Sequence, residues 1–387
     1  MSGPYILQPV SVRERIVALD VLRGFAMIGV LVAYCMWNLG TAPEESWSPL
    51  DKTIDAAASF AVDGKFYTIL AFLFGLGFSI QLRRASNDAA AVEVYCYRLA
   101  ALAGIGLLHA LLLRNGDILL PYALTGFLLI PFRRASDRTL IASAIAILLF
   151  TAAVRAFWPA LGLSVVQRPQ LEDAPYLVEN AAWVSYWYAT APFSWPTNLT
   201  LFLFGYCAGR RGTLTTLANQ RKTLVVLLAA GILAGTMFHF ARISLLDSAQ
   251  VSPVLGSGAW LLYTFHCWAM SSAYAAALLL ILRTRSGPAA LSSLSAIGRL
   301  ALTNYLLQAA LIVPVCLALD LFDQVTPTIA LLLAAAVLAV QVPFSLFWSR
   351  HFQFGPAEWI WRLLTYQRIP QLRLAPADAR ASSGGQS

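Results

Sequence analysis

The chain has 387 residues, of which 59% are hydrophobic and 12% are charged, with a formal net charge of +8. A soluble domain carries about 25% charged residues, so this composition excludes a protein whose whole surface faces water. The basic residues stand in short clusters between apolar runs, which is typical of a membrane topology signal rather than of a nucleic-acid site. We therefore expect an all-α polytopic membrane protein.

Ten apolar runs approach the length of about 20 residues that a helix needs to cross the hydrocarbon core. In chain order they are 19–39, 57–82, 97–113, 117–132, 139–158, 195–210, 222–243, 257–282, 296–319 and 326–349. The sixth run is the weakest, because Pro192 and Pro196 disturb its start. Residues 1–374 should form one membrane domain, and the small, polar residues 375–387 should form a disordered tail.

The charged residues alternate from one loop to the next. If both termini lie in the cytoplasm, 21 of the 27 Lys and Arg residues fall on the cytoplasmic side. Most acidic residues of the loops fall on the other side. Every second loop therefore carries the excess of Lys and Arg that is typical of cytoplasmic loops. We predict a multi-pass protein of the plasma membrane with both termini in the cytoplasm.

Ionisable residues at membrane depth are costly, so each of them is a candidate for function. His109 lies in the third run, and Asp117 begins the fourth run after a short hairpin turn. The turn would bring the carboxylate back toward the imidazole, and a His oriented by a carboxylate is the usual form of a general base. The alternative is that Asp117 caps the fourth helix while His109 bonds a neighbouring helix. We take His109 and Asp117 as the catalytic candidates.

Asp20 and Arg23 stand three residues apart near the inner edge of the first run and can pair on one helix face. Arg23 would either bind a phosphate or carboxylate that enters from the cytoplasm, or anchor the topology beside its own counter-ion. Lys65 would neutralise Asp63 or meet an anionic group in an outer cavity. The other substrate-binding candidates are Asn38, Tyr122, Asn304 and Gln308. The last two are equally suited to hydrogen bonds between helices.

Two aromatic stretches lie outside the apolar runs. The outer loop 156–194 is rich in Trp and Tyr and would lie flat on the membrane or roof a cavity. Residues 355–366 are aromatic and basic, and they would lie on the inner leaflet or plug the inner mouth of a cavity. The five cysteines have no Cys-x-x-Cys spacing and the four histidines are scattered, so we expect no metal and no bound cofactor.

Five polar motifs follow one another along the chain. They are Leu19-Asp20-Val-Leu-Arg23-Gly24, Asp63-Gly64-Lys65-Phe66-Tyr67, His109 with Gly116-Asp117-Ile-Leu-Leu-Pro-Tyr122, Gly298-Arg299-Leu-Ala-Leu-Thr303-Asn304-Tyr305, and Gly355-Pro-Ala-Glu358-Trp359-Ile-Trp361-Arg362. Together they resemble the YeiB-like family of bacterial inner-membrane proteins, whose core is a domain of unknown function (418). The resemblance implies a helical fold in the inner membrane, with the family's C-terminal part over about 210–370.

The first motif also resembles the opening of the transmembrane acyltransferases, which include the enzyme that acetylates the terminal glucosamine of heparan sulfate. That resemblance implies transfer of an acyl group from cytoplasmic acyl-CoA, as co-substrate, to a small-molecule or glycan acceptor at the outer face, with Arg23 near the CoA. Those enzymes place a catalytic His after their first membrane helix, and residues 40–60 contain none. His109, on a different helix, would have to replace it.

Two other functions fit the same residues. A transporter or transport-associated protein would use buried His, Asp and Lys side chains as a proton relay, although the sequence has no convincing inverted repeat. A structural partner would need His109 and Asp117 only for stability. An acyltransferase requires a cavity that reaches from Arg23 to His109. The expected partner is the lipid bilayer and not nucleic acid, and the sequence indicates no oligomeric state.

Overall fold

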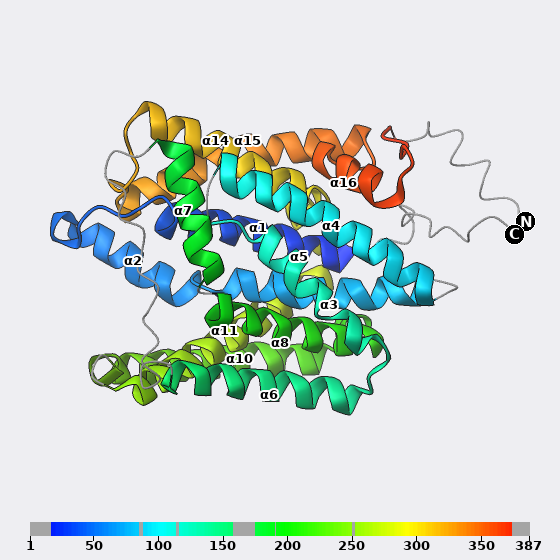
Figure 1. Ribbon diagram of the computed structural model, residues 1–387, viewed down its shortest axis with the longest axis horizontal. Coiled ribbons are helices and arrows are strands. Elements are labelled where there is room, and N and C mark those ends of the chain that lie inside the picture. Colours follow the sequence, from blue (N-terminus) through cyan, green and yellow to red (C-terminus); the bar gives the residue numbers. More distant parts are fainter. Residues whose placement is uncertain are drawn as a thin grey trace, which may run out of the picture.

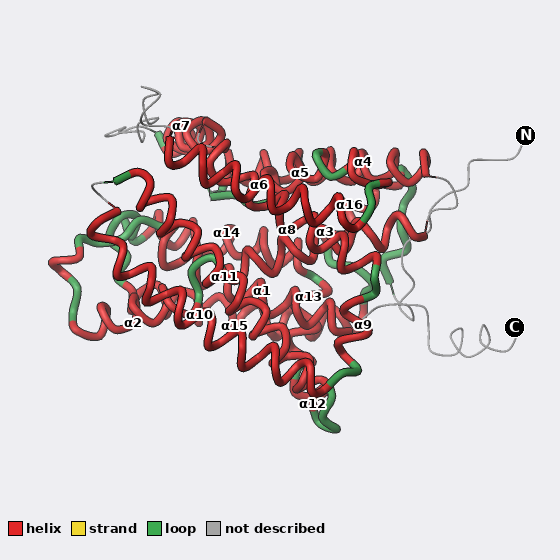
Figure 2. Tube along the Cα trace, turned by 90° about the horizontal axis from the view of Figure 1, so that it is seen from below, coloured by secondary structure: helices red, strands yellow, loops and turns green. Residues whose placement is uncertain are grey.

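A computed structural model describes residues 17–84, 88–113, 116–157, 175–189, 191–249 and 252–373 (Figure 1). This part of the chain consists of helices and their connections, without a β-sheet (Figure 2). The prediction of an all-α polytopic membrane protein is therefore confirmed. The predicted tail 375–387 and most of the outer loop before 175 lie outside the described residues.

Most of the helices run along the long axis of the molecule (Figure 1). The longer ones are α1 (Val17–Trp37), α2 (Pro49–Ala61), α3 (Lys65–Arg84), α4 (Asp88–Leu112), α6 (Asp137–Phe157), α7 (Tyr176–Ala189), α8 (Ala191–Arg210), α10 (Arg221–Ala249), α11 (Pro253–Leu282), α14 (Ala301–Ala318), α15 (Pro327–His351) and α16 (Pro356–Tyr366). The shorter ones are η2 (Glu44–Ser46), α5 (Leu119–Phe127), η3 (Ile130–Arg134), α9 (Thr213–Ala218), α12 (Gly287–Ala290) and α13 (Ser292–Arg299).

Eight segments of the described chain are long and apolar enough to cross a membrane. They are Val17–Trp37, Pro49–Arg83, Ala89–Leu112, Asp137–Phe157, Arg221–Leu246, Pro253–Leu282, Ala301–Ala318 and Pro327–His351. Each corresponds to one of the ten predicted runs. The run 117–132 forms only the short α5 and η3, and the run 195–210 lies in α8, where Pro196, Asn198 and Arg210 interrupt the apolar residues.

Three of the predicted runs are broken where we expected one continuous helix. The run 57–82 is interrupted between α2 and α3, where Gly64 has a φ of 76°, a conformation that only glycine adopts without strain. The run 117–132 breaks after Phe127, the end of α5, because Pro131 has no N–H for the carbonyl of Phe127 and its ring would clash with that carbonyl in a continued α-helix. The run 296–319 is divided at Leu300 into α13 and α14. An apolar pattern alone does not reveal such breaks.

Helix α1 lies near the centre of the bundle, and most of its residues are buried (Figure 1). Its closest neighbour is α13, where glycines of both helices allow the backbones to touch. A Cβ atom at Gly24 would overlap the carbonyl of Leu294, and one at Gly298 would overlap the carbonyl of Asp20. Small residues permit this close approach of helices in membrane proteins. The contact fixes the start of α1 against the end of α13, which carries Arg299.

The outer helices present large apolar side chains to their surroundings. Leu149 and Phe150 on α6, Leu233 and Phe240 on α10, and Leu332 on α15 are all exposed. A soluble protein rarely exposes such a continuous apolar surface. The surface is instead what a helix bundle surrounded by lipid requires.

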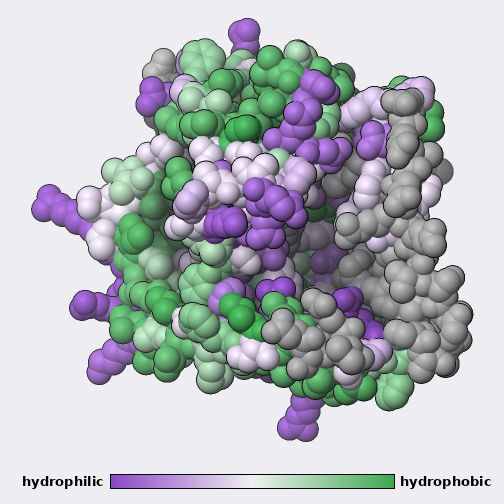
Figure 3. All heavy atoms as spheres, turned by 90° about the vertical axis from the view of Figure 1, so that its left-hand side faces the viewer, coloured by the Kyte–Doolittle hydropathy of each residue, from purple (hydrophilic) through white to green (hydrophobic). Residues whose placement is uncertain are grey.

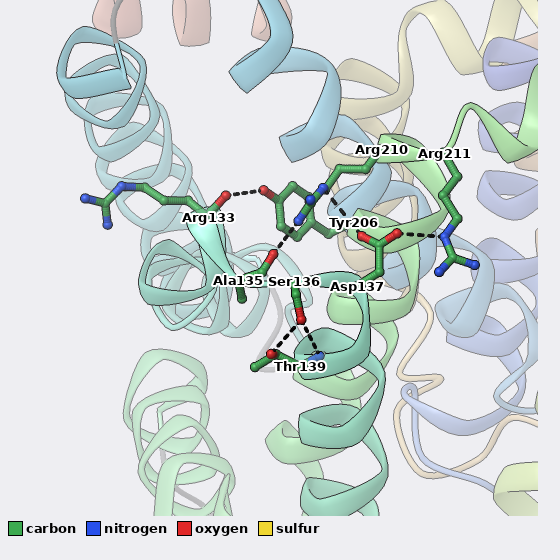
Figure 4. A network of polar contacts seen from close by, with 8 residues as sticks. All are labelled: Arg133, Ala135, Ser136, Asp137, Thr139, Tyr206, Arg210 and Arg211. Atoms are coloured by element: carbon green, nitrogen blue, oxygen red, sulfur yellow. Dashed lines mark hydrogen bonds and ion pairs between the residues drawn. The ribbon is translucent and has the colours of Figure 1, made fainter.

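We call the end of the bundle where α1 begins and α3 ends the basic end; it is on the right in Figure 1. At this end, α8 holds the turn before α6 (Figure 4). The Tyr206 hydroxyl donates to the carbonyl of Arg133 at 2.6 Å. The Arg211 guanidinium donates to Asp137 at 2.8 Å, and Arg210 lies 3.6 Å from the same carboxylate. Asp137 at the start of α6 is thus held by two arginines from the end of α8.

The opposite end of the bundle, on the left in Figure 1, carries hydrophilic side chains near its middle and apolar ones above and below them (Figure 3). Here α7 runs across the long helices instead of along them. Asn180 on α7 donates to the carbonyl of Leu111 at 3.4 Å, and the Tyr176 hydroxyl donates to the carbonyl of Leu113. Helix α7 therefore packs over the end of α4, the helix that carries His109. That the aromatic loop lies flat on the membrane or roofs a cavity stays a prediction.

Candidate functional site

A cavity of about 370 Å³, which we call the chamber, lies between α1, α3, α4, α5, α14 and α16. Its wall at the basic end is polar and includes Asp20, Arg23, Gln81, Tyr95, Arg98, Arg299, Glu358, Arg362 and Tyr366. Its deeper wall is mainly apolar and includes Met27, Leu70, Leu73, Phe74, Leu102, Ile118, Leu119, Tyr122 and Tyr305. A volume of a few hundred Å³ with this division of polar and apolar walls is typical of small-molecule sites.

Four guanidinium groups and two carboxylates line the chamber at the basic end. Arg23 lies 3.6 Å from Asp20 on the same face of α1. Arg98 stacks on the ring of Trp361 at 4.4 Å and donates to the Gln81 side chain at 3.4 Å. These contacts fix the guanidinium of Arg98 without using a carboxylate, so its charge is available to an anion.

Glu358 belongs to α16 but serves as the cap of α14. Its carboxylate accepts hydrogen bonds from the backbone N–H of Leu302 at 2.7 Å and of Thr303 at 3.2 Å. Burial raises the pKa of Glu358, against the opposing effect of the hydrogen bonds from Thr303 and Leu302. Together with Trp361, whose indole donates to the Arg98 carbonyl at 2.9 Å, Glu358 holds α16 across the chamber. Of the two predictions for residues 355–366, the structure favours a plug at the mouth of a cavity.

His109 and Asp117 lie together at the far side of the chamber's deep wall. His109 Nδ1 is 3.1 Å from Asp117 Oδ1, and both side chains are almost completely buried. The two groups meet at ion-pair distance without an aligned hydrogen bond, and Nε2 of His109 has no partner among the described residues. Such contacts in ligand-free sites often tighten when a substrate binds. The predicted approach of the carboxylate to the imidazole is confirmed.

Asp117 also caps α5, so the alternative interpretation of this residue holds at the same time. Its Oδ2 accepts a hydrogen bond from the backbone N–H of Leu120 at 2.7 Å. Its Oδ1 accepts one from the hydroxyl of Tyr305 at 3.1 Å. The carboxylate thus uses one oxygen for the helix and the other for His109 and Tyr305.

Tyr305 is the boundary between the chamber and His109. Its ring centroid lies 4.8 Å from that of His109, and its hydroxyl accepts from the backbone N–H of Ile118 at 3.0 Å while it donates to Asp117. Beyond it lies a second cavity of about 10 Å³, roughly the space of one water molecule. Its walls include His109, Tyr34, Tyr67, Gly116 and Gln308, and it shares Ile118 and Tyr305 with the chamber.

Of the remaining substrate-binding candidates, some line a cavity and others are buried between helices. Tyr122 lines the chamber and donates to the Tyr67 carbonyl at 2.8 Å. Gln308 lines the small cavity. Asn304 is fully buried and donates to Ser345 at 2.9 Å, which is the predicted bond between helices.

Asn38 and Lys65 line neither of these two cavities. Asn38 packs against Gly116, beside the small cavity. Lys65 is fully buried, and its ammonium group donates to the carbonyl of Ser59 at 2.8 Å. No ion pair joins Lys65 to a carboxylate in the described ranges, so a direct contact that neutralises Asp63 is not observed, nor does Lys65 line either cavity described above.

Sequence analysis did not identify several residues of the site. Arg98 belongs to the basic residues of the topology signal, and the motif that contains Arg299 and Tyr305 assigns neither of them a place in a site. Arg299 ends α13, Tyr305 stands about one turn into α14 and Arg98 almost three turns into α4, and all three line the chamber. Glu358 was part of an amphipathic stretch, and nothing in that pattern indicates that it caps α14.

The comparisons with known proteins cover nearly the whole chain. The family model described as "Protein of unknown function (DUF418)" matches residues 208–368, which run from the end of α8 to the end of α16. The uncharacterized protein YxaH of Bacillus subtilis is 30% identical over 93% of this chain and 96% of its own length. The chain belongs to the DUF418 family.

Two further relatives extend the same similarity. The uncharacterized 39.9 kDa protein in the amylase 3′ region of Bacillus acidopullulyticus is 30% identical over 96% of this chain and all of its own length. The uncharacterized protein YeiB of Escherichia coli is 27% identical over 91% of this chain. No solved structure matches the chain. The YeiB-like resemblance of the five motifs is thus confirmed, and the relatives' names state no activity.

Proposed function

We propose that this DUF418 protein is a membrane-embedded acyltransferase. In this proposal the basic end faces the cytoplasm of a bacterium at its inner membrane, since Lys and Arg gather on that side of multi-pass proteins. An acyl thioester such as acyl-CoA enters the chamber there, and a small-molecule or glycan acceptor approaches from the opposite end. The observation that carries the proposal is the chamber itself, which runs from Arg23 to Tyr305, the side chain in contact with His109 and Asp117.

The His109–Asp117 pair has the arrangement of a general base and its orienting carboxylate. With Nδ1 directed to Asp117, the opposite ring nitrogen, Nε2, is left to accept a proton. In the reaction Nε2 takes the proton of the acceptor hydroxyl or amine, and the acceptor atom bonds to the thioester carbonyl carbon. The C–S bond then breaks, and the departing thiolate takes the proton from the imidazolium.

The cavity from Arg23 to His109 that this reaction requires is not continuous in the structure, because His109 lines the small cavity and not the chamber. Tyr305 and Ile118 line both cavities, and Tyr305 is held by one hydrogen bond to Asp117 and one from Ile118. Rotation of the Tyr305 side chain would join the two cavities at the cost of these bonds. The proposal therefore requires that Tyr305 moves when donor and acceptor are bound.

The test uses the full-length protein purified in a neutral detergent. We expect it to transfer or hydrolyse the acyl group of acyl-CoA, and we expect His109→Ala to lose this activity while the protein remains folded. Because His351 is exposed and lines neither cavity, His351→Ala is a matched control that should keep full activity. An active His109→Ala variant would refute the assigned role of the histidine.

A proton-coupled transporter is the second candidate, and one observation favours it. His109 and Asp117 are each only 2% exposed, so a proton carried by the pair would be isolated from both ends until Tyr305 moves. Uptake into proteoliposomes that depends on a pH gradient and is abolished by Asp117→Asn would decide for transport. Acyl transfer without such uptake would decide for the enzyme.

A further inference from the structure

We propose that the chamber binds an amphipathic ligand that carries a phosphate group at the basic end and an acyl chain along α3 toward Tyr305. The inference rests on the same site as the proposed function and names the chemical class of its donor. It concerns binding alone, so it stands or falls separately from acyl transfer.

The first support is the charge of the chamber's mouth. Four guanidinium groups face two carboxylates. Glu358 is already occupied by the N-terminus of α14, and Asp20 lies beside Arg23. No ion pair within the described residues joins Arg98 or Arg299 to a carboxylate, although Asp20 attracts Arg299 over a longer distance. Arginines that face one another in a cavity are stabilised by a bound anion.

The second support is a set of hydrogen-bond donors without acceptors. The Tyr95 hydroxyl, the Gln81 amide nitrogen and Nε of Arg299 are buried and have no partner within the described ranges. All three residues line the chamber, and Tyr95 is only 3% exposed. A buried donor without a partner costs about 1–3 kcal/mol. The three residues belong to α3, α4 and α13. A phosphate offers more oxygens to donors from different helices than the two of a carboxylate.

The third support is the length and chemistry of the space above these donors. On α3 the chamber extends from Gln81 to Leu70, which is about 16 Å along the helix axis. Between these residues stands Gly77, and no atom lies within 4 Å of the position its Cβ would occupy. The walls around this space are apolar, Phe74 and Leu73 among them. A phosphate alone would leave that space unused, and an acyl chain fits it.

Phosphate and acyl chain occur together in a soluble acyl-CoA and in a phospholipid such as phosphatidic acid. Binding is therefore measured calorimetrically with palmitoyl-CoA, with phosphatidic acid in detergent, with CoA alone and with palmitate. We expect one or both of the phosphate-bearing acyl ligands to bind more tightly than CoA and than palmitate. The tighter of the two identifies whether the phosphate and acyl chain come from a soluble thioester or from a phospholipid. Palmitate binding as tightly as either would overturn the phosphate part of the proposal.

Gly77 and Gly104 offer a matched pair of variants for the acyl part. Both are helical glycines with open space at the Cβ position, but Gly104 is exposed on α4 and does not line the chamber. We expect Gly77→Leu to lower the affinity for the acyl ligand about 10-fold, equivalent to one or two lost methylene contacts, and to leave the affinity for CoA unchanged. Gly104→Leu should change neither. Equal effects of both variants would exclude an acyl chain along α3.

Arg98 and Arg362 test the phosphate part, with Arg83 as a control at the same end of the bundle but outside the chamber. Loss of one charged contact should lower the affinity for the phosphate-bearing ligand about 10-fold or more in Arg98→Gln and Arg362→Gln. Arg83→Gln should bind it with the wild-type affinity. A chamber variant is used only if it elutes on gel filtration as the wild type does, and one such variant is sufficient for the test. Normal binding in a folded chamber variant would refute the site. Tight binding without any acyl transfer would refute the proposed function and leave this inference intact.

Discussion

His109 Nδ1 lies 3.1 Å from Asp117 Oδ1, and the same oxygen accepts the hydroxyl of Tyr305 at 3.1 Å. One carboxylate oxygen therefore connects α4, α5 and α14. Because both contacts depend on the negative charge of Asp117, a single substitution there should affect the base and its boundary residue together. The side chains of His109 and Asp117 are each 2% exposed, so water cannot reach the pair and replace the contacts that such a substitution removes.

Asp117→Asn should separate the chemistry of this residue from its role as a helix cap. The amide can still accept from the N–H of Leu120, so the loss of stability should be about 1 kcal/mol or less. It cannot orient a protonated His109, so acyl transfer should fall about 100-fold or more. The measurement compares transfer rates with thermal unfolding of the same samples. Asp137→Asn, in the exposed cluster at the basic end, is the control and should keep the wild-type rate.

Tyr305→Phe removes a hydroxyl that both donates and accepts. The N–H of Ile118 loses its acceptor and Asp117 loses a donor, which should cost about 1–3 kcal/mol of unfolding free energy. The phenyl ring still fills the boundary between the cavities. Unfolding by denaturant in detergent measures the cost. Unchanged stability would mean that the hydroxyl is not held as described, and that Tyr305 is free to turn without breaking bonds.

Most of the fold follows from the sequence, because a helix that crosses lipid must be a continuous run of about 20 apolar residues. Eight of the ten apolar runs are helices of sufficient length, and the pairing of His109 with Asp117 follows from a turn too short to separate them. The breaks at Gly64 and Leu300 do not follow, because a run stays apolar whether or not its backbone bends.

The chamber is harder to predict than the helices. Arg98 and Arg299 carry the same charge as every topology signal at their end of the bundle, so sequence does not distinguish an arginine in a cavity from one in a loop. Glu358 meets Leu302 across 56 residues of chain, a contact that no local pattern contains. Long-range packing, not local preference, therefore determines which basic residues form the site.

Glu358 should make stability depend on pH. Burial raises the pKa of Glu358 in the folded state above the usual value of 4.5, so the folded protein binds this proton more tightly than the unfolded chain does. The stabilisation from that proton is fully present below pH 4.5 and is lost as the pH rises through the folded-state pKa. Melting temperatures measured from pH 4 upward should decline in the wild type relative to Glu358→Gln, whose amide does not titrate. Parallel curves for the two proteins would show that the carboxyl does not titrate in this way.

The contact of α1 with α13 should be the least tolerant of added volume. A methyl group at Gly298 would overlap the backbone carbonyl of Asp20, and neither helix can give way without moving Arg23 or Arg299. Gly298→Ala should therefore destabilise the protein by about 3 kcal/mol or prevent folding, as overpacking of a tight core does. Gly104→Ala is the matched control, because its Cβ meets no atom and alanine favours a helix by about 1 kcal/mol over glycine. Expression level and unfolding in detergent compare the two. If Gly298→Ala were as stable as Gly104→Ala, the two backbones would not be in contact, and α13 would not fix the position of the arginines at the chamber's mouth.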